Sequence, residues 1–127
     1  MFRAGDEPAL HRVMSYWFAM TLEIQNAVAA TFAGHLNSKF RLLDEPTTEL
    51  ELVEVFDGST SHHVNFSLVF RGPLQPVLPQ RIYPVEHAAL GRFDLFIVPV
   101  RRDAQGLYYE AVFNRVSETT PFANERP

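Results

Sequence analysis

Glu86 and His87 are adjacent in the sequence, and their residue types are those most often used for acid–base catalysis. The residues around them alternate in polarity as in a β-strand, where neighbouring side chains point to opposite faces of the sheet. Two side chains on opposite faces cannot share one pocket. We therefore expect structural roles for both, with Glu86 forming an ion pair with Arg81 or Arg92. A hydrolase that uses the pair is the less favoured alternative.

Other residues that could bind a metal or act as a nucleophile lack the required spacing. No two histidines follow an HxH or HxxxH pattern beside a carboxylate, and no GxSxG turn presents a serine. The histidines are His11, His35, His62, His63 and His87. Glu49, Glu51 and Glu54 could bind a cation, but their spacing is more typical of a solvated strand face. The sequence predicts no catalytic residue, no metal and no cofactor.

The stretch of residues 71–81 carries the binding surface that the sequence predicts. Its three prolines fix the backbone in a stiff, extended course, so the apolar residues between them are hard to bury. The prolines are Pro73, Pro76 and Pro79, and the apolar residues are Leu74, Val77 and Leu78. Arg71 adds a planar fork of hydrogen-bond donors. Two alternatives remain open: Arg71 is a structural clamp at the end of its strand, and the apolar residues cap one end of the fold.

These residues must be positioned by β-strands. From Lys39 onward hydrophobicity alternates with a period of two, and turn residues recur every eight to twelve positions. This pattern predicts strands at residues 39–43, 48–56, 63–71, 81–87, 92–101 and 107–115. The alternation changes phase near Val53, which predicts a β-bulge. In the third strand Val64, Phe66, Leu68 and Phe70 share one face.

The strand at residues 92–101 is apolar on both faces after Asp94, so we expect it at the centre of the fold with a helix over one face. Its pairing should end on one side at Pro99, because proline has no backbone N–H. The predicted core contains Phe93 or Phe96 together with Leu95, Ile97 and Phe113. The segments HAALG and RRDAQG predict hairpin turns, and Gly106 can adopt positive φ in the second.

One helix is expected before the strands. Thr21 is a plausible N-cap, and Gly34 or Asn37 would end the helix. Its apolar stripe is Ile24, Ala27, Val28, Phe32 and Leu36. The predicted fold is mainly β: a small antiparallel barrel or curled sheet of about six strands, with one N-terminal helix covering an open end or face. An open two-layer sandwich is the closest rival.

Composition restricts the function classes. A chain of 127 residues with 46% hydrophobic residues forms one packed domain, at residues 21–116, between an appendage at residues 1–20 and a tail at 117–127. The net charge is −4 and Lys39 is the single lysine, which argues against nucleic acid as a partner. The apolar run at residues 13–22 is too short for a membrane span and lacks a signal-peptide pattern, so a cytoplasmic location is the default. We expect residues 1–19 to be dispensable for folding.

The segments FSLVFRGP, LPQRIYPVEHAALGRFDLFIVP and YYEAVFN resemble a family of small bacterial domains of unknown function, numbered 6916. The resemblance covers residues 21–114, and KFRL at residues 39–42 matches an early strand of the family pattern. His87 and Asn114 match it too, and capping of turns is a sufficient role for both. The family implies no activity. Some members are encoded near proteins with phage-tail collar domains, which implies at most an accessory or structural role beside fibres.

The leading functional expectation is a non-enzymatic domain that binds a protein partner through residues 71–81, with Arg71, Leu74, Val77 and Leu78 as the contact residues. A homo-oligomer is compatible with this expectation. The alternative is a β-barrel that binds a small ligand, which would require an apolar cavity open to solvent.

Overall fold

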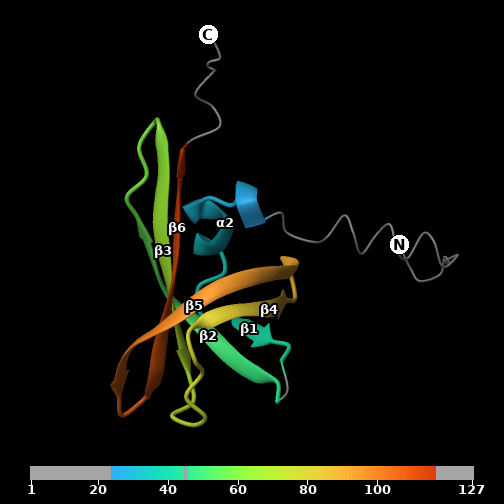
Figure 1. Ribbon diagram of the computed structural model, residues 1–127. Helices are drawn as coiled ribbons and strands as arrows, with labels where there is room; N and C mark the ends of the chain where they lie inside the picture. Colours follow the sequence, from blue (N-terminus) through green and yellow to red (C-terminus); the bar gives the residue numbers. More distant parts are fainter. Residues whose placement is uncertain (1–23, 45, 117–127) are drawn as a thin grey trace, which may run out of the picture.

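Six antiparallel strands build the fold of the computed structural model, which describes residues 24–44 and 46–116 (Figure 1). They are β1 (Lys39–Leu42), β2 (Thr48–Asp57), β3 (His63–Gly72), β4 (Arg81–His87), β5 (Gly91–Asp103) and β6 (Gly106–Val116). Each predicted strand is present, and its ends lie within two residues of the predicted ones. The appendage expected at residues 1–20, the N-cap expected at Thr21 and the tail expected at residues 117–127 lie outside the described residues.

The strands close into a ring in the order β1-β2-β3-β6-β5-β4. Closure depends on β1, which pairs with β2 along one edge and with β4 along the other. Arg41, for example, lies opposite both Glu49 of β2 and Glu86 of β4. The mainly β fold of about six strands is confirmed, in the form of a closed ring rather than an open sandwich.

β5 changes partner halfway along its length. It pairs with β4 up to Ile97 and with β6 from Val98 onward, and the register shifts between Pro99 and Arg101. The predicted end of pairing near Pro99 is therefore confirmed. The predicted bulge in β2 is also present, as a register shift between Leu52 and Glu54. Because β5 turns away, β3 and β6 continue together beyond the ring, and their paired ends project from it at the top of Figure 1.

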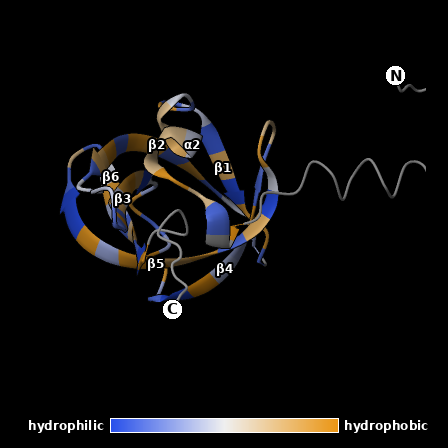
Figure 2. Cartoon of the chain, turned by 90° about the horizontal axis from the view of Figure 1, so that it is seen from above, coloured by the Kyte–Doolittle hydropathy of each residue, from blue (hydrophilic) through white to orange (hydrophobic). Residues whose placement is uncertain are grey.

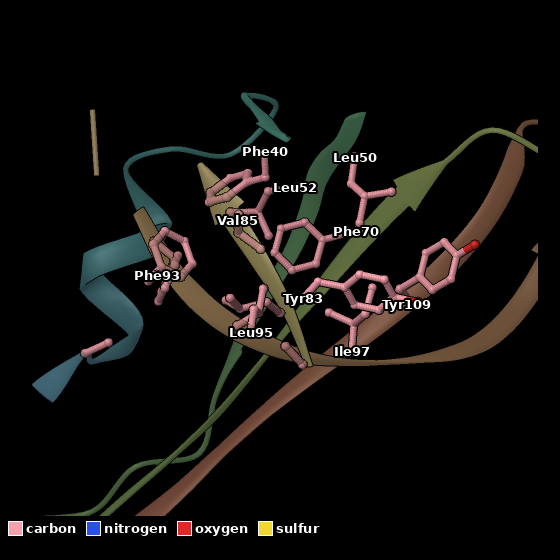
Figure 3. Close-up of a cluster of buried hydrophobic side chains, with 14 of the residues drawn as sticks. Phe40, Leu50, Leu52, Phe70, Tyr83, Val85, Phe93, Leu95, Ile97 and Tyr109 are labelled. Atoms are coloured by element: carbon pink, nitrogen blue, oxygen red, sulfur yellow. The ribbon is translucent and has the colours of Figure 1, made fainter. Parts of the chain in front are cut away.

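The interior of the ring is filled by side chains from alternate strand positions (Figure 3). Hydrophobic and hydrophilic residues alternate along the strands when the fold is viewed from above (Figure 2). The largest fully buried side chains of the strands are Tyr83, Tyr109, Phe40, Phe70, Leu42, Leu50, Leu52, Leu68, Ile97 and Val85. The shared face predicted for Val64, Phe66, Leu68 and Phe70 is confirmed, since all four are buried.

The predicted N-terminal helix is present but shorter than expected: the 3₁₀ helix η1 (Ile24–Asn26) and the α-helix α2 (Ala29–Ala33) occupy its place. Val28 separates them because its backbone is extended, with φ −127° and ψ 170°, and its N–H donates to Thr31 Oγ1 at 3.1 Å. This break turns Val28 outward, where it is exposed. α2 ends at Gly34, as expected, while Asn37 adopts positive φ on the way to β1.

α2 covers an open end of the ring through Phe32, which is fully buried. The Phe32 ring lies 5.8–6.4 Å, between centroids, from four phenylalanines on four different strands. These are Phe40, Phe66, Phe93 and Phe113. Each such aromatic pair stabilises the fold beyond the effect of the area that it buries. One side chain therefore closes the mouth of the ring.

The expectation that a helix covers the outer face of β5 is wrong. Phe96 is 48% exposed and Val100 is 46% exposed, because α2 lies over the end of the ring instead of over this face. Phe93 is the buried member of the predicted Phe93/Phe96 alternative, and Leu95 and Ile97 are buried as predicted. Phe113 is partly buried and stacks on Phe66.

Within residues 24–44 and 46–116, no helix is long and apolar enough to cross a bilayer. η1 has three residues and α2 has five, whereas a spanning helix needs about 20.

Ile97 and Phe96 are neighbours with opposite burial, so they form a matched pair for testing the core. Ile97→Ala should lower the free energy of unfolding by about 2 to 5 kcal/mol, because it removes a fully buried side chain and leaves a cavity. Phe96→Ala should cost less than about 1 kcal/mol, because the ring is half exposed. Urea unfolding followed by circular dichroism measures both. Equal losses for the two variants would contradict this placement of the core.

Candidate functional site

Glu86 and His87 lie on opposite faces of β4, as predicted. Glu86 is on the outer face, where its carboxylate accepts hydrogen bonds from Arg41 Nη2 at 2.5 Å and Arg92 Nε at 3.4 Å. The hydrogen bond from Arg41 is the main cause that lowers the pKa of Glu86. The predicted ion pair with Arg92 is confirmed, while the alternative with Arg81 is not formed, since Arg81 pairs with Asp44. An ionised, paired carboxylate of this kind holds strands together.

His87 is buried, and its ring holds the turn between β4 and β5. Its Nδ1 accepts hydrogen bonds from the backbone N–H groups of Ala89 at 3.0 Å and Leu90 at 3.1 Å. A nitrogen that accepts two N–H groups carries no proton, so the proton of the neutral ring lies on Nε2. The turn-capping role expected for His87 is confirmed.

The other ring nitrogen of His87 links β4 to the segment between α2 and β1. Nε2 donates to Ser38 Oγ at 2.9 Å, and Ser38 Oγ donates to the carbonyl of His35 at 2.5 Å. The His87 ring also packs on Phe40 and His35, with centroids 4.3 Å and 4.9 Å away. Burial, and then the neighbouring His35, lower the pKa of His87. With both nitrogens engaged, His87 stabilises the fold in its neutral form.

Charged side chains alternate in sign across the outer faces of neighbouring strands. One row runs Glu49, Arg41, Glu86, Arg92 from β2 through β1 and β4 to β5, and a second runs Lys39, Glu51, Arg71 from β1 through β2 to β3. Opposite charges on directly opposed residues stabilise a sheet by about 0.2 to 1 kcal/mol each. The acidic residues of β2 thus belong to a solvated strand face.

Arg71 belongs to the second row. Its Nη2 donates to Glu51 Oε1 at 2.8 Å, and its Nη1 lies 3.5 Å from Gln105 Oε1. The hydrogen bond to Glu51 is the main cause that raises the pKa of Arg71. These contacts favour the clamp interpretation for Arg71.

Asn114 does not cap a turn, so that expectation is wrong. It lies in the third pair from the end of the β3–β6 ladder, opposite Asn65, where its Oδ1 forms a hydrogen bond with His63 Nε2 and not with a turn. The two strands extend past the ring together, which places Asn114 on a continuous sheet face instead of at a strand end.

The connection between β3 and β4 bends at residues 74–76 and contains a cis peptide bond before Pro76, so it is not uniformly extended as predicted. Two buried tyrosines hold it to the ring. Tyr109 Oη accepts from the Leu78 N–H at 3.1 Å, and Tyr83 Oη donates to the Pro79 carbonyl at 2.5 Å. Sequence reasoning missed both contacts, although inward-facing tyrosines among aliphatic residues usually mark a buried hydroxyl that needs a partner.

The three apolar residues of this connection divide between the two roles left open. Leu78 is partly buried and packs against the core, as expected of a residue that caps the fold. Leu74 is 36% exposed and Val77 is 58% exposed. A fixed backbone that presents Leu74 and Val77 to solvent can make apolar contacts at low entropic cost.

The hairpin between β5 and β6 is held by Asp103, whose Oδ1 accepts from the N–H groups of Gln105 at 2.8 Å and Gly106 at 3.2 Å. The hydrogen bond from Gln105 is the main cause that lowers the pKa of Asp103. Gly106 approaches the backbone of β3 so closely that a Cβ there would lie 2.3 Å from the Gly72 carbonyl oxygen. Glycine is required at this turn by close approach as well as by its positive φ.

The described part of the chain supports neither a metal site nor a small-ligand site inside the ring. Its histidines and carboxylates form no group of three that could hold a metal ion. The interior positions of the ring hold large side chains such as Tyr83, Phe70 and Tyr109, so a ligand inside would have to displace them.

The neutral form of buried His87 predicts a pH-dependent stability. Because folding lowers the pKa of His87 below its ordinary 6.5, the unfolded chain takes up this proton first as the pH falls. The contribution is complete above about pH 6.5 and decreases below it, so the free energy of unfolding should fall from pH 7 toward pH 5. Urea titrations across this range should give a shallower pH dependence for His87→Gln than for the wild type. A His87→Gln slope equal to that of the wild type would contradict the assignment.

Comparisons with curated proteins and with solved structures give no match. A family model described as "Domain of unknown function (DUF6916)" matches residues 27–113. These residues run from the segment before α2 into β6 and include Phe32, the whole charge row of Glu86 and the capping residue His87. The match therefore covers the ring and the side chain that closes its mouth. The chain belongs to the DUF6916 family.

Proposed function

We propose that this domain is a non-enzymatic protein-interaction module that binds its partner through the connection at residues 71–81. The observation that carries the proposal is the exposure of Leu74 and Val77 on a backbone that Tyr83 and Tyr109 fix from inside the ring. Apolar side chains that are already ordered lose little entropy on binding, so even a small contact area contributes to affinity.

The chemistry of the other candidate residues supports a binding role over catalysis. Glu86 is held by two arginines, His87 uses both ring nitrogens, and Arg71 is directed to Glu51. A general acid or base needs a proton-accepting position that a substrate can reach. In Glu86 and His87 that position is engaged in a contact that holds the fold, and the Arg71 guanidinium, which is a donor only, is paired with Glu51.

The partner in this proposal is a protein. The family resemblance suggests that it belongs to the fibre proteins with phage-tail collar domains. A role beside phage-tail collar fibres would make this domain an accessory part of a fibre assembly. The ring is a suitable scaffold for such a role, because its strands close on one another and two buried tyrosines hold the connection to it. The small-ligand alternative is less favoured, because the interior of the ring is occupied.

The double variant Leu74→Ser/Val77→Ser tests the proposed surface. It should recover at least about tenfold less partner than the wild type, because both exposed apolar contacts are lost. Leu78 is left unchanged because it packs against the core. The measurement is affinity capture from an extract of the source cell with quantitative mass spectrometry, together with co-expression of a collar-domain fibre protein.

Phe56→Ser is the matched control, because Phe56 is 56% exposed on β2, away from the connection. All three proteins should show the same thermal unfolding. Equal recovery of every captured protein by the double variant and the wild type would refute the proposed surface. Binding lost equally in the double variant and in Phe56→Ser would refute it as well.

A further inference from the structure

The C-terminal half of β6 has one edge that no other described strand occupies. β5 pairs with β6 only as far as Val98 opposite Glu110, and then turns toward β4. β3 continues along the other edge to the pair His63 and Val116. Residues 111–116 therefore present a row of backbone N–H and C=O groups on the side away from β3. An open edge of this kind can receive an additional strand.

The face of this segment that turns toward the core ends at Arg115, whose Nε has no hydrogen-bond partner among the described residues. Arg115 lies opposite Val64, which belongs to the buried face of β3 with Phe66. The Arg115 Nε is buried, and no described residue accepts a hydrogen bond from it. Buried donors are almost always paired in folded proteins, and leaving one unpaired is costly. Arg115 thus lacks the acceptor that its position requires.

The opposite face of the same segment presents two exposed valines on either side of Asn114. Val112 is 62% exposed and Val116 is 67% exposed. Residues at alternate positions of a neighbouring strand would lie directly against them, and the positions between would lie against Phe113 and Arg115.

We propose that the free edge of residues 111–116 binds an extended segment of a partner protein as an added antiparallel strand. The segment carries a carboxylate on the face toward Arg115 and β-branched apolar side chains toward Val112 and Val116. Backbone hydrogen bonds supply affinity in this mode of recognition, and the side chains of alternate positions supply specificity. The carboxylate satisfies the Arg115 donor with a charge-assisted hydrogen bond.

Charge distribution argues against a second copy of the chain as the occupant. If two β6 edges paired about a two-fold axis, Arg115 of each copy would meet residues of the same sheet face, namely Ala111 and Phe113. Glu110 lies on the other face, one residue out of phase. Both Arg115 side chains would remain without an acceptor, and an inward-pointing charge at an edge discourages such self-pairing.

This edge is separate from the surface proposed above. In Figure 1 the β3–β4 connection lies at the lower end of the fold, and the end of β6 lies at the upper end. The inference therefore does not depend on the role of residues 71–81.

Capped six-residue peptides of alternating valine and threonine, with aspartate, asparagine or lysine at the third position, are suitable probes. Titrated into the ¹⁵N-labelled full chain, the aspartate peptide should shift the backbone amide signals of residues 111–116 most. It should bind at least about tenfold more tightly than the lysine peptide. The aspartate peptide N-methylated at alternate residues of one edge should not bind, because its backbone donors are removed.

Arg115→Gln should reduce binding of the aspartate peptide to the level of the asparagine peptide. Arg102→Gln, which removes an exposed arginine of β5, should leave it unchanged. Amide shifts centred elsewhere, equal binding of the three peptides, or full binding of the N-methylated peptide would overturn the proposal without any variant. Concentration-dependent self-association of Arg115→Gln, with no effect of the peptides on the wild type, would overturn it too and would show that Arg115 serves only to prevent self-pairing.

Discussion

Pairing of β1 on both of its edges is the constraint on which the rest of the structure depends. β1 has four residues, yet it joins β2 to β4 and so turns a sheet into a ring. Its two inward residues, Phe40 and Leu42, are buried, and the outward Arg41 interacts with β4 through Glu86. A short strand can perform this role only because each of its residues contributes either to the core or to the charge rows outside. Ring closure is what keeps the large interior side chains away from water.

The ring is too wide at one end to be filled by strand residues alone, and this explains the form of the N-terminal segment. Where β5 turns toward β4, the ends of β3 and β6 continue without it, and the mouth between them needs an apolar side chain from another element. Phe32 fills it from α2. The linkage from His35 through Ser38 to His87 then holds that segment to the β4–β5 turn. The same departure of β5 leaves the second edge of β6 without a described partner. The mouth that Phe32 closes and the open edge of β6 therefore have one cause.

Local features of this fold were predictable from the sequence, and long-range ones were not. The strands and the β2 bulge follow from alternation and from its change of phase near Val53, both of which are local signals. The Glu86–Arg92 pair was predictable because the two residues flank one hairpin. Arg41 was not, since it is 45 residues away from Glu86 and nothing near either residue indicates their register. The helix was predicted as continuous because its apolar residues are spaced as one helical stripe. In the structure the backbone is extended at Val28, and the α-helix that follows places Phe32 in the mouth of the ring.

The order in which the strands are synthesised differs from the order in which they pair. β1 and β2 can form a hairpin early, but the second edge of β1 waits for β4, and the second edge of β3 waits for β6. The last pair of that ladder joins His63 to Val116. For most of the time of its synthesis the chain therefore carries two unpaired strand edges, those of β1 and β3, and an apolar sheet face that is not yet covered. The chain between β1 and β4, and the chain between β3 and β6, must each close as a long loop before the strands can pair. Folding of the ring is therefore slow compared with a helical domain of equal size. Until β6 has left the ribosome, these unpaired edges and this apolar face make the nascent chain prone to aggregation.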